Sequence, residues 1–215
     1  MRVIAIDGPA GSGKSTVAKA VAARLGMAYL DTGAMYRAVA FAALRRGIDP
    51  EDAETVARLA IQVDLDVADS VSVDGVDATI EIRGPEVTRA VSSVAANPEV
   101  RRELNRRQRE WAAAHDGGVI EGRDIGSVVF PEADVKVYLT ADDSERAARR
   151  SKEVLALDYD QVAADIARRD HADLTREAAP LAVPDDAVVL DTTGRPIEEV
   201  VEEVLELAER QRRPA

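Results

Sequence analysis

Residues 3–16 read VIAIDGPAGSGKST, a short apolar run that turns directly into a glycine-rich segment. The residues that satisfy the pattern G-x-x-x-x-G-K-[S/T] are Gly8, Gly13, Lys14 and Ser15. The apolar run predicts a buried parallel strand, and a helix-forming stretch follows over residues 16–25. The backbone N–H groups of such a loop, and the dipole of the helix that it opens, favour an anion. The stretch therefore predicts a phosphate-binding loop.

The loop further predicts a bound nucleoside triphosphate, because this pattern holds a chain of phosphates rather than a single one. The residues expected to cradle it are Gly8, Pro9, Ala10, Gly11, Ser12, Gly13, Lys14, Ser15 and Thr16. We expect Lys14 to reach the β- and γ-phosphates and the Ser15 hydroxyl to ligate Mg²⁺. ATP and Mg²⁺ are thus the expected cofactors.

Composition limits the classes of protein that the chain can belong to. Its 215 residues and 46% hydrophobic content suit one core, with room for an inserted subdomain. The net charge of −12 argues against binding to a nucleic acid polymer. The early strand and the lack of an eighteen-residue apolar run predict no signal peptide and no membrane span. With no cysteine, we expect a cytoplasmic protein, and its acidic composition predicts a monomer.

Strand-like and helix-like segments alternate along the chain, which is typical of a parallel sheet covered by helices on both faces. Strands are expected over residues 3–6, 28–30, 119–121, 135–139 and 188–190. Helices are expected over residues 14–25, 34–46, 53–61, 97–115, 143–155, 159–169 and 196–210. Residues 64–81 instead alternate apolar and acidic side chains around Asp74-Gly75, which indicates a β-hairpin. The prediction is a three-layer α/β/α P-loop fold with a five-stranded parallel sheet and a small antiparallel insert.

A phosphate loop is shared by GTPases, ATPase motors and kinases. The GTPase interpretation requires the base-reading pattern N-K-x-D, which is absent, and the D-x-x-G at residues 191–194 lies too close to the C-terminus. A motor usually has an acidic residue at the end of an apolar strand. Glu121 fits that role only weakly, since Gly122 indicates a turn. Neither class is favoured.

Arginines after two strands favour a kinase with a small anionic acceptor. Residues 30–37 (LDTGAMYR) and 121–124 (EGRD) each follow a strand, and they bring in Arg37 and Arg123. Ligands of open α/β sheets bind beyond the carboxyl ends of the strands, so both arginines should face the phosphate loop. A third, arginine-rich stretch lies between Arg146 and Arg176, and it predicts a helical lid, although some of its charges suit a solvated surface.

The chain resembles the bacterial cytidylate kinase family, a branch of the nucleoside monophosphate kinases, over nearly its whole length. The segments that carry the resemblance are IDGPAGSGKST (6–16), LDTGAMYRA (30–38), PEVTRAVSSVAANPEVR (85–101), RRQREW (106–111), EGRDIGSVVFPEADVKVYLTA (121–141), ERAARR (145–150) and RRDHADLTREAAPLAVPDDAVVLDTT (168–193). The resemblance implies transfer of the ATP γ-phosphoryl group to CMP or dCMP. It also implies a P-loop core (residues 1–63, 92–145 and 179–215), an acceptor-binding insert (64–91) and a lid (146–178).

The resemblance also implies roles for single residues. The acceptor-binding set is Thr32, Arg37, Ser92, Arg101, Arg123, Asp124, Arg169, Asp173 and Arg176. Within it, Arg37, Arg169 and Arg176 are implied on phosphate, Ser92 and Arg101 on the cytosine edge, and Asp173 on the ribose hydroxyls. The implied catalytic set is Lys14, Arg123, Arg146, Arg150 and Arg169. Glu121 stands where aspartate is also common in the family.

Several alternatives remain open at this point. The acceptor could be UMP or shikimate instead of a cytidine nucleotide, and a slow ATP-hydrolysing switch would need no acceptor arginines. Tyr36, Phe41 and Trp111 are interpreted as core residues, and neither histidine is expected to be catalytic. The acceptor phosphate is already an anion, so positioning and electrostatics should carry the rate.

Overall fold

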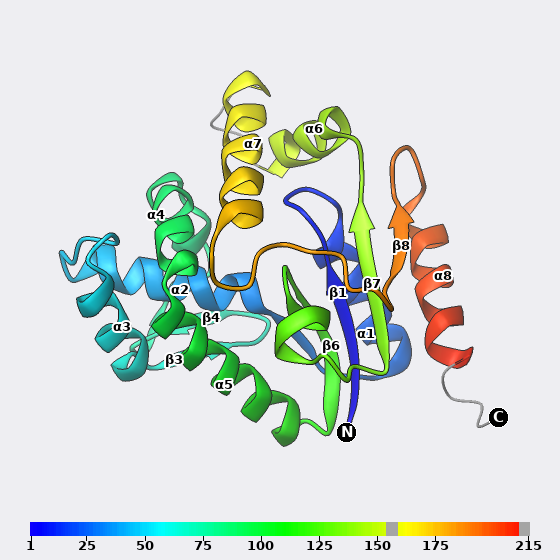
Figure 1. Cartoon of the computed structure of the whole chain (residues 1–215), viewed down its shortest axis with the longest axis horizontal. Coiled ribbons are helices and arrows are strands. Elements are labelled where there is room, and N and C mark those ends of the chain that lie inside the picture. Colours follow the sequence, from blue (N-terminus) through cyan, green and yellow to red (C-terminus); the bar gives the residue numbers. More distant parts are fainter. Residues whose placement is uncertain (154–158, 211–215) are drawn as a thin grey trace.

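The computed structural model describes residues 1–153 and 159–210, and within them it shows a five-stranded parallel sheet of order β2-β6-β1-β7-β8 (Figure 1). The strands are β1 Arg2–Asp7, β2 Tyr29–Asp31, β6 Gly117–Gly122, β7 Val135–Thr140 and β8 Val188–Asp191. All four strand pairs are parallel. The predicted sheet is confirmed, with strand ends displaced by one or two residues.

Helices cover both faces of this sheet, which gives the predicted three layers (Figure 1). Their bounds are α1 Lys14–Leu25, α2 Thr32–Arg45, α3 Ala53–Gln62, α4 Pro85–Ala96, α5 Pro98–Ala114, α6 Asp143–Glu153, α7 Tyr159–Thr175 and α8 Ile197–Arg210, with a short 3₁₀ turn at Glu81–Arg83 and a π turn at Ile125–Val129. One core cluster joins the sheet to α1 and α8. A larger cluster joins it to the helices between α2 and α5. Phe41 and Trp111 pack against the larger cluster, as predicted.

The interrupted stretch after α3 is a small antiparallel sheet, as predicted. It contains β3 Leu65–Val67, β4 Val71–Val73 and β5 Val76–Asp77. The turn between β4 and β5 places Asp74 at φ 51° and Gly75 at φ 74°. Two successive positive φ angles suit the two-residue hairpin turn for which Asp-Gly is a strong signal.

Two helices differ from the sequence prediction. Helix α4 is absent from it, although Pro85 at its first turn is a recognisable start signal. Helix α7 continues past residue 169 to Thr175, so the basic and acidic residues 169–173 lie on a helix. The predicted helix over 143–155 agrees with α6 up to Glu153, and residues 154 and 155 fall outside the described residues.

Glycines allow the phosphate loop to lie close to neighbouring backbone. A Cβ on Gly8 would lie 2.0 Å from the carbonyl oxygen of Leu139, and Gly8 has φ 148°. Gly13 caps α1 in the left-handed conformation at φ 89°. Both positions therefore require glycine, and the loop closes tightly between β1 and α1.

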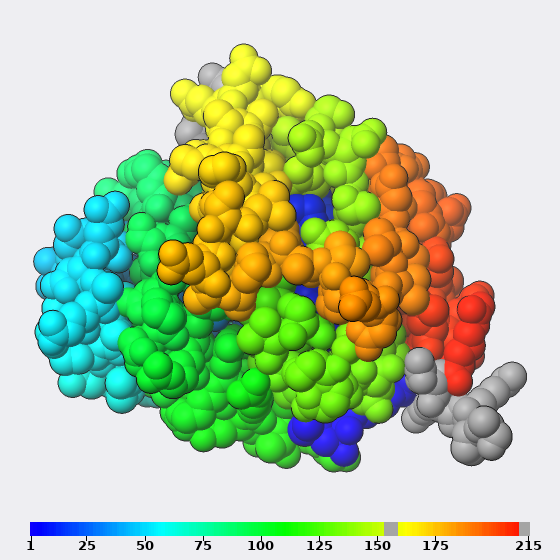
Figure 2. All heavy atoms as spheres, viewed as in Figure 1, coloured from blue at the N-terminus to red at the C-terminus, as the bar shows by residue number. Residues whose placement is uncertain are grey.

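Helices α6 and α7 lie above the carboxyl ends of β1 and β7 (Figure 1). In the space-filling view, α7 and the chain after it lie across the front of the molecule, and part of the blue N-terminal region shows in a small area beside α7 (Figure 2). The boundary predicted between insert and core, at residues 91 and 92, falls inside α4. The division into core, insert and lid (146–178, of which 154–158 lie outside the described residues) stays a prediction. None of the helices in the described ranges has the length and apolar composition of a membrane span.

Candidate active site

The phosphate loop holds its lysine in a buried position. Lys14 is 6% exposed, and its Nζ donates a hydrogen bond to the carbonyl oxygen of Pro9 at 2.7 Å. Burial, followed by the nearby Arg123 guanidinium, lowers the pKa of Lys14 to about 7. A polyphosphate in the loop would favour the ammonium form, because opposite charge stabilises it. An anionic ligand in the loop would therefore raise the pKa of Lys14 and stabilise its charged form.

The peptide of Ala10 connects the phosphate loop to α6 and α7. Its N–H donates to Asp170 Oδ1 at 3.1 Å, and its carbonyl oxygen accepts from Arg146 Nη1 at 2.9 Å. Arg146 and Asp170 also form an ion pair with each other. Arg146 thus contacts the backbone of the loop and does not line the pocket described below. Its predicted catalytic role stays a prediction, and the geometry favours a role in holding the loop.

Arg37 of α2, Arg150 of α6 and Arg169 of α7 form a group of neighbouring arginines. Burial, and then the charges of Arg169 and Arg150, lower the pKa of Arg37 well below its usual value. Burial and the Arg123 guanidinium lower the pKa of Arg169 to about 10. Like charges that depress one another's pKa values destabilise the site until an anion joins them. The group therefore has the electrostatics of a phosphate site.

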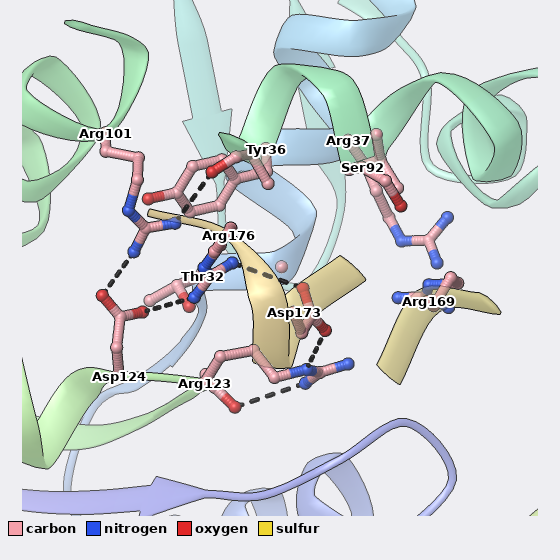
Figure 3. A pocket seen from close by; sticks show the side chains of 14 residues that line it. Thr32, Tyr36, Arg37, Ser92, Arg101, Arg123, Asp124, Arg169, Asp173 and Arg176 are labelled. Atoms are coloured by element: carbon pink, nitrogen blue, oxygen red, sulfur yellow. Dashed lines mark hydrogen bonds and ion pairs between the residues drawn. The ribbon is translucent and has the colours of Figure 1, made fainter. Parts of the chain in front are cut away.

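A chain of alternating charges lies next to this group (Figure 3). Arg101 pairs with Asp124, Arg176 Nη2 lies 3.7 Å from Asp124 Oδ1, Arg176 Nη1 lies 3.3 Å from Asp173 Oδ1, and Arg123 Nε donates to Asp173 Oδ2 at 2.9 Å. Arg101 is fixed further by the carbonyl oxygen of Ala95 at 3.1 Å and by the Tyr36 ring, 5.4 Å from its guanidinium carbon. Each of these polar groups is therefore held in position by contacts with its neighbours.

The charged chain and two of these arginines, Arg37 and Arg169, line a single pocket. Its empty space, including open solvent at its mouth, is about 520 Å³. All the predicted acceptor-binding residues line it: Thr32, Arg37, Ser92, Arg101, Arg123, Asp124, Arg169, Asp173 and Arg176. Tyr36 lines it too, although the sequence interpretation placed it in the core, where it is also buried. The acceptor roles of these residues stay predictions.

Glu121 is a site residue that the sequence analysis undervalued. Ser15 Oγ donates to Glu121 Oε2 at 2.9 Å, and the glutamate is buried. Burial, and then the Asp31 carboxylate, raise its pKa. Gly122 does not begin a turn at this point but ends strand β6, so Glu121 stands at the carboxyl end of an apolar strand. The run Val119-Ile120-Glu121 was the available signal.

Asp7 joins the phosphate loop to the segment that carries Arg123 and Asp124. It ends β1, and its two carboxylate oxygens accept the backbone N–H groups of Ile125 and Gly126 at 2.9 and 2.8 Å. Burial raises the pKa of Asp7 to about 6, although these hydrogen bonds oppose the shift. No role for Asp7 follows from the sequence alone.

The raised pKa of Asp7 predicts a pH-dependent loss of stability. The folded state binds the proton more tightly than the unfolded state, whose pKa is near 3.8, so stability falls as pH rises through about 6. Between pH 5 and 7 we expect the free energy of unfolding of the wild type to fall by about 1 kcal/mol relative to Asp7→Asn. Urea unfolding of both proteins at several pH values measures the difference, and parallel pH profiles would contradict it.

A phosphate loop after the central strand of a parallel sheet, facing a second pocket lined with arginines, defines a P-loop kinase of small molecules. The family model described as cytidylate kinase matches residues 4–210. This chain belongs to the cytidylate kinase family. It is 49% identical to the cytidylate kinase of Mycolicibacterium paratuberculosis (strain ATCC BAA-968 / K-10), with 95% of this chain and 94% of that protein covered.

Further comparisons agree with this assignment. The cytidylate kinase of Desulfitobacterium hafniense (strain Y51) is also 49% identical, over 95% of this chain and 91% of that protein. Among solved structures, a sugar kinase from Janibacter sp. HTCC2649 has a TM-score of 0.51 at 19% identity, with 97% of this chain and 95% of that chain covered. At that identity the structural likeness supports the fold alone.

Proposed function

We propose that this protein transfers the γ-phosphoryl group of ATP to CMP or dCMP, forming ADP and CDP or dCDP. The observation that carries the proposal is the group of neighbouring arginines, two of which, Arg37 and Arg169, line the pocket. Arg37 is buried and Arg169 is half-buried, and desolvation, followed by the like charges around them, lowers their pKa values. The acceptor phosphate would supply the missing negative charge at the point where it meets the ATP γ-phosphate.

The charged chain along the pocket supports a cytidine base. Cytosine presents acceptors at O2 and N3 and an amine donor at C4. The paired Arg101 and Asp124 present donors and a carboxylate acceptor from neighbouring positions. Uracil has a carbonyl at C4 and an N3–H, so it would place an acceptor against the carboxylate. Asp173, which closes the chain beside Arg123, is the candidate partner of the ribose hydroxyls.

The donor half of the site fits Mg²⁺. Ser15 offers a hydroxyl and Glu121 a carboxylate within 2.9 Å of each other, and Mg²⁺ prefers oxygen ligands that include one or two carboxylates and substrate phosphates. The described residues contain no group of three or more His, Cys, Asp or Glu able to hold a metal by themselves. Mg²⁺ would enter with ATP and neutralise charge on the phosphate oxygens.

The reaction needs little chemistry from the side chains. An oxygen of the acceptor phosphate forms a bond to the γ-phosphorus while the bond from that phosphorus to the β–γ bridging oxygen breaks. The attacking oxygen is already anionic, so no general base is required, and positioning and charge stabilisation carry the rate. We assign charge stabilisation to Lys14, Arg123, Arg150 and Arg169. Arg146 would act through the Ala10 peptide.

A panel of acceptors tests the proposal. ADP formation with ATP and Mg²⁺ is measured against CMP, dCMP, UMP, AMP and GMP. We expect turnover that depends on the acceptor and is greatest with CMP or dCMP. A maximum with UMP would overturn the cytidine assignment alone, whereas equal rates with and without every acceptor would overturn the kinase.

Arg37→Ala serves as the control that separates a kinase from a slow ATP-hydrolysing switch. Arg37 lies in the acceptor pocket, so a switch would hydrolyse ATP at an unchanged rate without it, while a kinase would lose acceptor-dependent turnover. A cytoplasmic location and a monomeric state belong to the same proposal. The first follows from a sequence without cysteine, and the second from the strong net charge of −12.

A further inference from the structure

Tyr29 and Ser15 share the carboxylate of Glu121. Ser15 Oγ donates to Oε2 at 2.9 Å, and the Tyr29 hydroxyl donates to Oε1. Each oxygen of the carboxylate therefore has its own donor, which fixes both the position and the rotation of the group. Tyr29 is not among the residues to which the sequence analysis assigned a role.

The sheet register explains how these side chains meet. Tyr29 is paired with Val119 and Asp31 with Glu121 on the parallel strands β2 and β6. Tyr29 is thus displaced by two residues from the partner of Glu121, and side chains two residues apart lie on the same face of a sheet. The long phenol spans this diagonal. The ring packs with the core cluster below α1, and Lys19 Nζ of that helix lies 5.4 Å from the ring centroid.

The hydrogen bond between Tyr29 and Glu121 has one direction. A phenol carries a proton to donate and a carboxylate only accepts, and the Tyr29 hydroxyl donates to Oε1 of Glu121. The direction of the second hydrogen bond is then also set, because the Ser15 hydroxyl has to donate its proton to the other carboxylate oxygen.

We propose that Tyr29 is a positioning residue for the metal–nucleotide half of the site. By fixing Glu121, it orients the Ser15 O–H toward the carboxylate, which would leave the lone pairs of Ser15 Oγ available to a divalent cation. This inference rests on the proposed function only for the identity of that cation, Mg²⁺ carried by a nucleotide. It makes no reference to the acceptor, so it can be tested without one.

Tyr29→Phe in the full chain removes one oxygen and keeps the ring. Binding of ADP is measured by calorimetry with Mg²⁺ and again with the metal chelated. We expect the affinity for Mg²⁺–ADP to fall about tenfold, as for other residues that orient a metal ligand, while metal-free ADP binding is unchanged. An unchanged affinity in both conditions, or an equal loss in both, would overturn the proposal.

Two further variants sharpen the test. Lys19→Met alters the packing over the ring and keeps the phenol, so this variant should bind Mg²⁺–ADP as the wild type does. The same loss of affinity in this variant would show that packing is the cause, and would overturn the role of the hydroxyl.

Glu121→Gln should show the metal-specific loss of affinity, and adding Tyr29→Phe to it should cause little further change, because both substitutions act through one group. Additive losses would overturn the proposal. If Tyr29→Phe fails to fold, Glu121→Gln alone decides: the absence of a metal-specific loss in that variant would overturn the proposal.

Discussion

Replacing Lys14 with alanine is expected to lower kcat about a hundredfold to a thousandfold with every acceptor, a loss of about 3–4 kcal/mol of transition-state stabilisation. The amine lies inside the phosphate loop, 2.7 Å from the carbonyl oxygen of Pro9. Charge develops on the oxygens around the transferred phosphorus, and a buried ammonium stabilises that charge more strongly than an exposed one. Steady-state kinetics at saturating ATP and CMP measure the effect.

The fold should survive this substitution, which separates a catalytic loss from unfolding. Lys14 lies among the like charges of Arg123 and Arg169, and burial together with Arg123 lowers its pKa to about 7. Removing the amine relieves this repulsion but also loses its hydrogen bond to the Pro9 carbonyl oxygen. Because these two effects oppose each other, we expect little change in the midpoint of urea unfolding, and we expect unchanged binding of CMP. A kcat within tenfold of the wild type would show that Lys14 does not stabilise the transition state.

The strands and the first helix could be predicted because local signals agree with the fold. The loop pattern places glycine where positive φ angles are required, and helix α1 spans the residues expected for it, Lys14–Leu25. The hairpin at Asp74-Gly75 was predictable for the same reason. Helix α4 was not predicted, since valine, serine and threonine occupy half of Pro85–Ala96 and weaken its helical propensity. Its burial against the larger core cluster outweighs that weakness.

The residues of the candidate site could likewise be predicted only in part. Arginines after strand ends could be predicted, because topology alone brings those ends together. The partners of buried carboxylates could not. Asp7 meets backbone N–H groups 118 and 119 residues away, and Glu121 meets Ser15 across 106 residues. The partners of Arg146 could not be predicted either. Its place in the sequence suggests a lid arginine, whereas its contacts in the structure include the Ala10 carbonyl oxygen and Asp170.

Arg101→Met is expected to abolish most of the preference for CMP over UMP. The guanidinium pairs with Asp124, and both side chains are almost fully buried. Its removal leaves a carboxylate without its close donor and removes the donors proposed for O2 and N3 of cytosine. We expect kcat/KM with CMP to fall about tenfold to a hundredfold, from 1–3 kcal/mol of lost hydrogen bonding. The rate at saturating CMP should fall less, because the arginines around the phosphate are untouched.

The same substitution should destabilise the fold, since breaking a buried ion pair costs about 3–5 kcal/mol. The double variant Arg101→Met with Asp124→Asn separates the two effects. It removes both charges, so it should recover part of the lost free energy of unfolding without restoring the preference for CMP. Recovery of both the free energy of unfolding and the preference for CMP would mean that Arg101 acts only by stabilising the fold. A CMP-to-UMP ratio that stays at the wild-type value in either variant would place the base-reading groups elsewhere, because a pocket that still discriminates without this pair cannot depend on it.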